Sequence, residues 1–368
     1  MKIISFYLPQ YYSFPENDKW WGKGFTEWTN VKKSKPLFKN HYQPTVPLNG
    51  NYYSLEDINT MKWQADLARK YGIYGFCFYH YWFGEDRQLM QKPVDAWLEH
   101  KEIDFPFCLC WANHNWSRTW TGGDKDILMD MRYGDEKEWE KHFLYLLPFF
   151  KDKRYIQINN KPVFVIYLPQ DISCLKEMLI YFKKRAKESG LNGLTIVSQN
   201  FVYSENKQKV DELLDYRINY EPNRIIADGI LNNLKNEILW SIDVFLYKLR
   251  RKIKSISNNK LFNVRTYNYD FAWRCILNRK VIDEKEIAGA FVNCDVTPRR
   301  QDRAIIFRGA TPNKFEYYLK LLKKKVEKEF SSDWTFVSAW NEWGEGMYLE
   351  PDEKHKYAYL EAIKRALG

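Results

Sequence analysis

Two glutamates near the carboxy-terminal end of the sequence have the type and spacing to act on a sugar. Glu342 and Glu345 lie three positions apart and are interleaved with Trp340 and Trp343. Paired carboxyl groups can divide glycosidic-bond chemistry between proton delivery and charge stabilisation. Indole rings cover the apolar faces of sugar rings and still offer an N–H group. This pattern predicts a carbohydrate-active site with Glu342 and Glu345 as its catalytic residues.

The same stretch has the features of a strand that ends in a tight turn. An apolar run at residues 334–340 turns abruptly polar at Asn341, and Gly344 and Gly346 allow the backbone to take positive φ. The alternative interpretation is a surface turn with solvated glutamates. The crowding of tryptophan and asparagine against the two acids favours a functional site over that alternative.

Short apolar runs alternate with amphipathic segments from one end of the chain to the other, and no linker or short repeat interrupts them. We predict strands at residues 3–8, 73–79, 105–111, 162–167, 194–198, 216–220, 288–294 and 334–340. We predict helices from an N-cap at Ser54 to Gly72, at 88–100, at 136–150, around 175–186, from Pro312 and at 354–367. This order predicts one α/β domain over residues 1–368, a (β/α)8 TIM barrel with long βα loops. A doubly wound sheet is disfavoured because no glycine-rich phosphate loop follows the first strand.

Polar and aromatic side chains follow almost every predicted strand, at the barrel end where active sites lie. The predicted substrate-binding residues are Tyr7, Tyr79, His80, Trp82, Trp111, Asn113, Trp116, Asn200, Glu221, Asp295, Trp340, Asn341 and Trp343. His114 and Asn115 are expected to line the cleft beside Asn113. Two of these residues have an equally good structural interpretation: His80 as a buried, hydrogen-bonded histidine and Glu221 as an ion-pair partner.

Positive charge is the second chemical feature of the chain. The net charge is +10, which is compatible with nucleic acid, an anionic membrane or phosphorylated substrates and does not choose between them. Four arginines follow Asp295, at positions 299, 300, 303 and 308. They could bind a phosphate or an acidic sugar through charge-assisted hydrogen bonds, or they could form a solvated face. We expect no nucleic-acid partner.

Composition narrows the class of protein further. Aromatic residues make up 17% of the chain, with 15 Trp, more than a core alone requires, which favours sugar ligands. The six cysteines form no CxxC pair or Cys/His ligand spacing, so we expect no metal and no cofactor. The apolar stretch at the N-terminus is too short, and polar residues follow it too early, for a signal peptide. No run approaches the ~20 apolar residues of a membrane span. We expect a cytoplasmic protein.

A basic insertion at about residues 230–285 interrupts the alternation of strands and helices. Within it, residues 246–254 combine leucine and isoleucine with lysine and arginine, as in an amphipathic helix that rests on anionic lipid. A solvated surface is the alternative interpretation. Contact with the inner membrane surface through this insertion is therefore open, and the sequence indicates no oligomeric state.

Several stretches together resemble a known family. They are residues 338–346, with 7–11, 24–28, 75–82 and 111–113. They are similar to the WbsX-type proteins of bacterial surface-polysaccharide gene clusters, which are related to glycoside hydrolase family 99, the endo-α-1,2-mannosidase group. The resemblance implies a (β/α)8 barrel and a metal-independent, retaining reaction on α-linked sugars.

The resemblance also implies a separate catalytic role for each of the two glutamates. In the hydrolase family the substrate's own 2-hydroxyl attacks the anomeric carbon and forms an anhydro-sugar. By position, Glu342 would assist that hydroxyl, while Glu345 would protonate the leaving oxygen and later activate water.

We therefore expect a glycoside hydrolase-like enzyme acting on α-glycosidic bonds in O-antigen or capsule metabolism. One alternative is a nucleotide-sugar-dependent glycosyltransferase with Arg299, Arg300 and Arg303 on the donor phosphate. The other is a non-catalytic carbohydrate-binding barrel.

Overall fold

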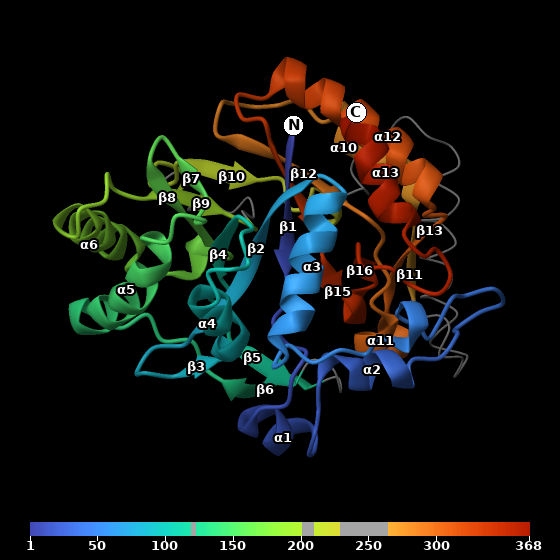
Figure 1. Ribbon diagram of the computed structural model, residues 1–368, viewed down its shortest axis with the longest axis horizontal. Helices are drawn as coiled ribbons and strands as arrows, with labels where there is room; N and C mark the ends of the chain where they lie inside the picture. Colours follow the sequence, from blue (N-terminus) through green and yellow to red (C-terminus); the bar gives the residue numbers. More distant parts are fainter. Residues whose placement is uncertain (119–122, 201–209, 229–263) are drawn as a thin grey trace.

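Eight parallel strands close into a barrel in the computed structural model, which describes residues 1–118, 123–200, 210–228 and 264–368 (Figure 1). In barrel order the strands are β1 (Lys2–Tyr7), β14 (Trp334–Ser338), β12 (Glu286–Phe291), β10 (Tyr216–Ile218), β9 (Thr195–Ser198), β8 (Lys161–Ile166), β4 (Phe107–Trp111) and β2 (Ile73–Trp82). Strand β1 pairs in parallel with both β14 and β2, which closes the sheet. The predicted (β/α)8 barrel is confirmed.

Helices follow the strands and cover the outside of the barrel (Figure 1). They are α3 (Ile58–Lys70), α4 (Gln91–Glu99), α5 (Glu136–Phe150), α6 (Leu175–Glu188), α8 (Asn223–Ala227), α10 (Tyr269–Asn278), α12 (Pro312–Glu329) and α13 (Ala358–Leu367). The predicted cap of α3 was wrong: Asp57, not Ser54, accepts the hydrogen bond from the Asn59 N–H at the first turn. Among the helices described, none has the length and apolar character needed to cross a membrane.

The segments that follow the strands gather at one end of the barrel, the lower end in Figure 1, toward which β1 points. They include α1 (Pro15–Trp21), α2 (Glu27–Lys33), η1 (Leu48–Gly50), β3 (Gln88–Leu89), β5 (Trp116–Arg118), β6 (Gly123–Met129), η3 (Pro169–Asp171), α11 (Thr297–Arg300), η5 (Gln301–Arg303), β15 (Asn341–Glu342), η6 (Trp343–Glu345) and β16 (Met347–Tyr348). The short strand β7 (Gln157–Ile158) instead precedes β8 and pairs with it. Active sites of such barrels are built on the loops after the strands.

The basic insertion is only partly described. Its described part is regular, because β11 (Arg265–Asn268) pairs with β13 (Ile305–Arg308) and leads into α10. The expectation that the insertion interrupts the alternation of strands and helices was wrong for this part. The predicted amphipathic helix at residues 246–254 lies outside the described residues.

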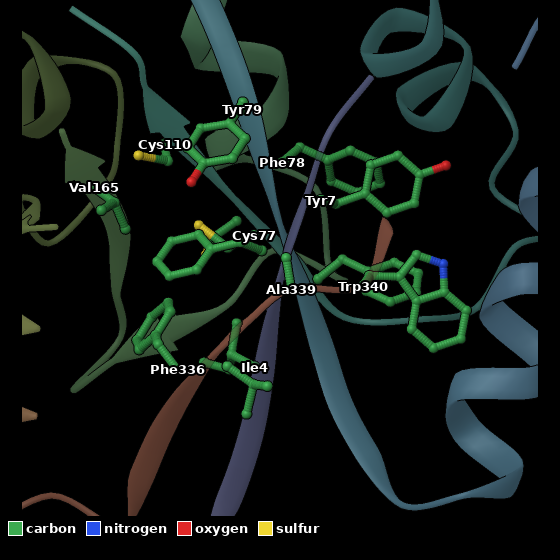
Figure 2. Packing of buried hydrophobic residues seen from close by; sticks show 14 of the residues in the cluster. Ile4, Tyr7, Cys77, Phe78, Tyr79, Cys110, Val165, Phe336, Ala339 and Trp340 are labelled. Carbon is green, nitrogen blue, oxygen red and sulfur yellow. The ribbon is translucent and has the colours of Figure 1, made fainter. Parts of the chain in front are cut away.

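Alternation along the strands separates the barrel interior from the layer beneath the helices. In Figure 2, Cys77 and Tyr79 lie on one side of β2, whereas Phe78 lies on the other with Tyr7 and Trp340. Successive side chains of a strand point to opposite faces, so both faces of β2 are filled. All five of these side chains are buried. The apolar runs of the sequence are continuous because each strand is covered on both faces.

Candidate active site

A cavity of about 350 Å³ opens at the carboxyl ends of the barrel strands. Among the described residues, its walls come from the end of β2 and from the segments after β1, β4, β8, β10, β12 and β14. The aromatic lining residues are Trp21, Tyr79, Tyr81, Trp116, Tyr167 and Tyr220. The polar lining residues are Gln10, His114, Asn115, Ser117, Arg299, Arg300, Glu342 and Glu345. The cavity therefore combines ring faces with carboxyl and amide groups, the lining typical of carbohydrate sites.

The two glutamates reach this cavity from a compact turn after β14. Strands β15 and β16 pair antiparallel, and the 3-10 turn η6 between them carries Glu345. Gly346 ends the turn with φ of 62°, in the left-handed region that favours glycine. The carboxyl of Glu342 is more enclosed than that of Glu345, with 10% against 28% of the side chain exposed. The turn thus presents one deep and one accessible acid.

One arginine gathers three carboxyl groups beside the cavity. The Nη2 of Arg299 lies 2.8 Å from Oε2 of Glu342, and its Nη1 contacts Oε1 of Glu345. Its Nε donates to Oε1 of Glu27 at 2.8 Å. Glu27 is fully buried at the first position of α2. We call Arg299 with these three acids the Arg299 cluster. It holds both predicted catalytic groups on one planar guanidinium, which fixes their relative orientation.

The surroundings of Glu342 in the cluster move its pKa away from that of an ordinary carboxyl group. Burial raises the pKa of Glu342 to about 8, with Glu345 and Glu27 adding to the rise and Arg299 opposing it. At neutral pH this carboxyl is therefore mostly protonated. Once ionised it is a stronger base than a solvent-exposed glutamate.

Over residues 1–118, 123–200, 210–228 and 264–368, no group of three His, Cys, Asp or Glu side chains could hold an ion. The positive charge that faces the glutamates is the Arg299 guanidinium itself.

Gly344 is required for the close contact between Glu27 and Arg299. A Cβ atom built on Gly344 would lie 1.6 Å from Oε1 of Glu27 and 2.9 Å from Nε of Arg299. We expect Gly344→Ala to separate this pair, to lower the free energy of unfolding by about 1–3 kcal/mol and to reduce turnover. Thermal unfolding and turnover measure the two effects. Gly190→Ala is the control for turnover: a Cβ there meets nothing within 4 Å and Gly190 is outside the cavity, but its φ of 84° strains an alanine, so this variant should lose stability and keep its turnover. Wild-type turnover in Gly344→Ala would contradict the expectation.

Of the predicted substrate-binding residues, Tyr79 and Trp116 line the cavity beside the two glutamates. His114 and Asn115 line it as well, but Asn113 does not. The Asn113 side chain donates to the carbonyl of Leu168 and accepts from its N–H, both at 2.8 Å. Asn113 therefore joins the segments after β4 and β8.

Four predicted residues lie behind the cavity. Nε2 of His80 lies 2.9 Å from Nε2 of His142, and burial lowers the pKa of His80 to about 3, so it is neutral. Trp82 stacks on His142, and the Trp111 indole donates to the Trp82 carbonyl at 2.8 Å. The Tyr7 hydroxyl donates to Oε1 of Gln64 in α3 at 2.6 Å (distance between oxygens). These four side chains do not line the cavity and instead connect strands to helices.

The asparagine and tryptophans of the motif stabilise the turn rather than line the cavity. Asn341 accepts from the Leu8 N–H at 2.7 Å and donates to the Leu8 carbonyl at 3.0 Å, which joins the ends of β1 and β14. Trp343 stacks on Tyr348 with ring centroids 3.8 Å apart, and its N–H donates to buried Glu350 at 2.7 Å. Trp340 is fully buried.

Three further predicted residues lie outside the cavity lining. Buried Glu221 pairs with Arg279, which is the ion-pair alternative considered for it. Asp295 accepts from Nε2 of His41 at 2.7 Å and from Nε2 of Gln43 at 2.8 Å, and it faces a different cavity. The Asn200 N–H donates to the Tyr167 carbonyl at 2.9 Å.

Sequence reasoning missed Glu27 and Gln10 as site residues. Glu27 stands in the stretch 24–28 that resembles the family, which was its only signal. Nε2 of Gln10 and Nδ1 of His114 are buried at the cavity and have no hydrogen-bond partner among the described side chains and backbone. Two unsatisfied polar groups in an open cavity are suited to bind the hydroxyls of a ligand.

Solved structures share the fold over nearly the whole chain. The family 99 endo-alpha-mannosidase from Bacteroides thetaiotaomicron is 14% identical, with 99% of this chain and 96% of that chain covered and a TM-score of 0.54. A glycoside hydrolase-like protein is 13% identical, with 99% and 93% covered and a TM-score of 0.58. At these identities the similarity concerns the fold alone.

Sequence comparisons identify the family. Uncharacterized protein WxcX from Xanthomonas campestris pv. campestris is 29% identical over 368 residues, which are 99% of this chain and 49% of that protein, in strains B100 and ATCC 33913 alike. The chain thus spans about half the length of these curated relatives. The sequence model of the family described as Glycosyltransferase WbsX matches residues 3–363. The chain therefore belongs to the WbsX glycosyltransferase family.

Proposed function

We propose that this chain is an enzyme that acts on α-glycosidic bonds of a bacterial surface polysaccharide, such as O-antigen or capsule. The observation that carries the proposal is the Arg299 cluster, which holds Glu342 and Glu345 together on the wall of an aromatic cavity at the barrel mouth. The match to the WbsX family supports a carbohydrate substrate.

In the proposed first step, O2 of the sugar attacks the anomeric carbon as Glu342 takes the 2-hydroxyl proton. Glu345 gives a proton to the departing glycosidic oxygen, so the C–O bond breaks and a 1,2-anhydro-sugar remains. In the second step, water or an acceptor hydroxyl attacks the anomeric carbon and gives its proton to Glu345. The epoxide opens, and Glu342 returns its proton to O2. The anomeric carbon is inverted twice, so its configuration is retained overall. Both glutamates regain their starting protonation states.

The rest of the cavity would position the sugar. The rings of Tyr79 and Trp116 offer flat faces, and the amide of Gln10 offers donors to hydroxyl groups. Burial lowers the pKa of His114 to about 4, so its ring is neutral and can donate at one nitrogen and accept at the other. Neutral hydrogen-bonding groups on these walls fit a polyol.

A nucleotide-sugar-dependent transferase remains the second candidate, because the family is described as a glycosyltransferase. In that alternative Arg299 would bind the donor phosphate. Each of its three nitrogens already contacts a carboxyl group, so a phosphate would have to compete with these contacts. Arg300 and Arg303 are exposed and would remain for that role.

Substrate consumption separates these candidates. The protein is incubated with a panel of aryl α-glycosides that includes α-mannosides, and separately with nucleotide-sugars and an acceptor glycan. We expect the glycosides to be consumed, with transfer to an added alcohol acceptor. Consumption of nucleotide-sugars alone would establish the transferase. Binding of glycans without turnover of either substrate would establish the non-catalytic barrel.

The pH dependence of kcat/KM tests the role of Glu342. As a general base it must be ionised, and its ionised fraction falls tenfold per pH unit below its pKa of about 8. We therefore expect kcat/KM for an activated aryl glycoside to rise as the pH increases from 6 toward about 8. A rate that instead falls as the pH rises through about 8 would assign Glu342 the role of general acid.

A further inference from the structure

A second cavity, of about 310 Å³, lies on the other side of the loop that follows β12. We call it the Arg308 cavity, after the arginine at the end of β13 that lines it. Phe38, Tyr348 and Tyr359 supply aromatic surface, and Lys354 supplies a second cation. Neither the Arg299 cluster nor the aromatic lining of the first cavity belongs to it.

The cation of this cavity is held in place by a chain of contacts. The guanidinium carbon of Arg308 lies 4.8 Å from the centroid of the Phe38 ring. Phe38 stacks on His41 with centroids 4.4 Å apart and an angle of 10°, and Nε2 of His41 lies 2.7 Å from Oδ2 of Asp295. A loop from the first βα segment is thereby fixed to the loop after β12. The guanidinium is oriented before any ligand arrives, which lowers the entropy lost on binding.

Positive charge exceeds negative charge in this cavity. Lys39, Arg308 and Lys354 line it, and none of them forms an ion pair with a residue of the described ranges. Asp295 is the one acid among the described residues that line it, and both its oxygens are engaged: Oδ1 accepts from the N–H of Thr297 and Oδ2 accepts from Gln43. The surplus cations are free to meet an anion.

A hydroxyl group also faces this cavity. Thr45 lines it, and its buried Oγ1 has no hydrogen-bond partner in the described part of the chain. A buried hydroxyl without a partner is unusual and is suited to a polar ligand. Aromatic rings, oriented cations and an unsatisfied hydroxyl form the combination that recognises a charged saccharide.

We propose that the Arg308 cavity binds an acidic sugar residue. Its anionic group pairs with Arg308 and Lys354, its ring lies against Phe38, and one of its hydroxyls bonds to Thr45. The site would add a preference for anionic glycans to the selectivity of the first cavity. The proposal concerns binding and does not depend on the hydrolytic role of Glu342 and Glu345.

The second cavity is connected to the catalytic turn. The Asp295 N–H donates to the carbonyl of Glu345 at 2.7 Å, and Gly346 lies in the cavity wall. A ligand held by Arg308 would thus lie beside the turn that carries both glutamates. This adjacency is suited to a polymer that presents an acidic residue near the bond to be processed.

Calorimetric titration tests the proposal. The full chain is titrated with a hexuronic acid trisaccharide, with a neutral trisaccharide of equal length, with a hexose 6-phosphate and with inorganic phosphate. We expect binding of the uronate or the sugar phosphate to exceed that of the neutral trisaccharide at least tenfold, and to weaken as salt is added. Binding is then repeated with Arg308→Gln, Thr45→Val and the control Arg274→Gln, an exposed arginine of α10 that lies over the Phe271 ring and lines neither cavity.

Arg308→Gln is expected to weaken binding of the anionic sugar about tenfold or more, Thr45→Val to weaken it several-fold and Arg274→Gln to leave it unchanged. Thermal unfolding of each variant confirms that it is folded. Equal affinity for neutral and acidic trisaccharides, or unchanged affinity in Arg308→Gln, would overturn the proposal. Inorganic phosphate that binds as tightly as the sugar anions would overturn the assignment to a saccharide. The titrations measure binding and do not depend on turnover of aryl glycosides. Failure of this proposal is therefore distinct from failure of the proposed function.

Discussion

Replacing Glu345 with glutamine is expected to lower kcat/KM about 10²–10⁴-fold, the usual contribution of a positioned general acid. The amide occupies the same space and its oxygen can still accept from Arg299, but its N–H protons are not acidic enough to be transferred to the leaving oxygen. Because an activated leaving group needs little protonation, a dinitrophenyl glycoside should recover most of the first step. Glycoside turnover measured with activated and unactivated leaving groups separates these effects.

Two variants control this prediction. Glu342→Gln should also lose turnover, but without recovery on an activated leaving group, because the missing function is that of the base. Glu327→Gln, on the exposed face of α12, should behave as wild type. Full turnover in Glu345→Gln would contradict the assignment of the acid. Equal recovery of both glutamine variants by the activated substrate would contradict the division of roles.

Replacing Arg299 with methionine is expected to have the largest effect on stability and to abolish turnover. Three carboxyl groups would lose their common cation, and Glu27 is fully buried. Removing one partner of a buried ion pair typically costs about 3–5 kcal/mol in the free energy of unfolding. Chemical denaturation measures this loss, and Arg300→Met, next in sequence but exposed, is the matched control.

The sign of the pH effect makes this prediction specific. Arg299 lowers the pKa of Glu342, which burial raises to about 8, so without Arg299 this carboxyl keeps its proton to a higher pH. Above about pH 8 the folded variant holds a proton that the folded wild type has lost, so the stability deficit of Arg299→Met should shrink as the pH falls from about 9 toward about 7. A deficit that is independent of pH, or no larger than that of Arg300→Met, would contradict the electrostatic role of the cluster.

The barrel could be predicted because its strands are buried on both faces and appear as unbroken apolar runs. Strand β8 at Lys161–Ile166 lies within one residue of the predicted 162–167, and α5 at Glu136–Phe150 has the predicted bounds. The helices in the long loop after the first strand were harder to predict. It holds α1 and α2, each of seven residues, which are too short to show a clear helical period.

In the site, the pair Glu342 and Glu345 could be predicted from local spacing, but the orientation of their neighbours could not. Trp340, just before β15, and Trp343, in the same 3-10 turn as Glu345, are both buried, whereas Glu345 faces the cavity. The contact of Arg299 with Glu27 joins residues 272 positions apart, which no local pattern indicates. Sequence spacing shows which residues are close along the chain, whereas the cluster depends on which loops meet at the barrel mouth.

A crystal structure with a mannose-type iminosugar tests the central claim most directly, because the ligand marks where a charged anomeric centre would lie. The account predicts that the iminosugar binds in the aromatic cavity, with its ring nitrogen within hydrogen-bond distance of the Glu342 or Glu345 carboxyl and Arg299 still bridging the two. An iminosugar bound elsewhere, with both carboxyl groups directed away from it, would contradict the account.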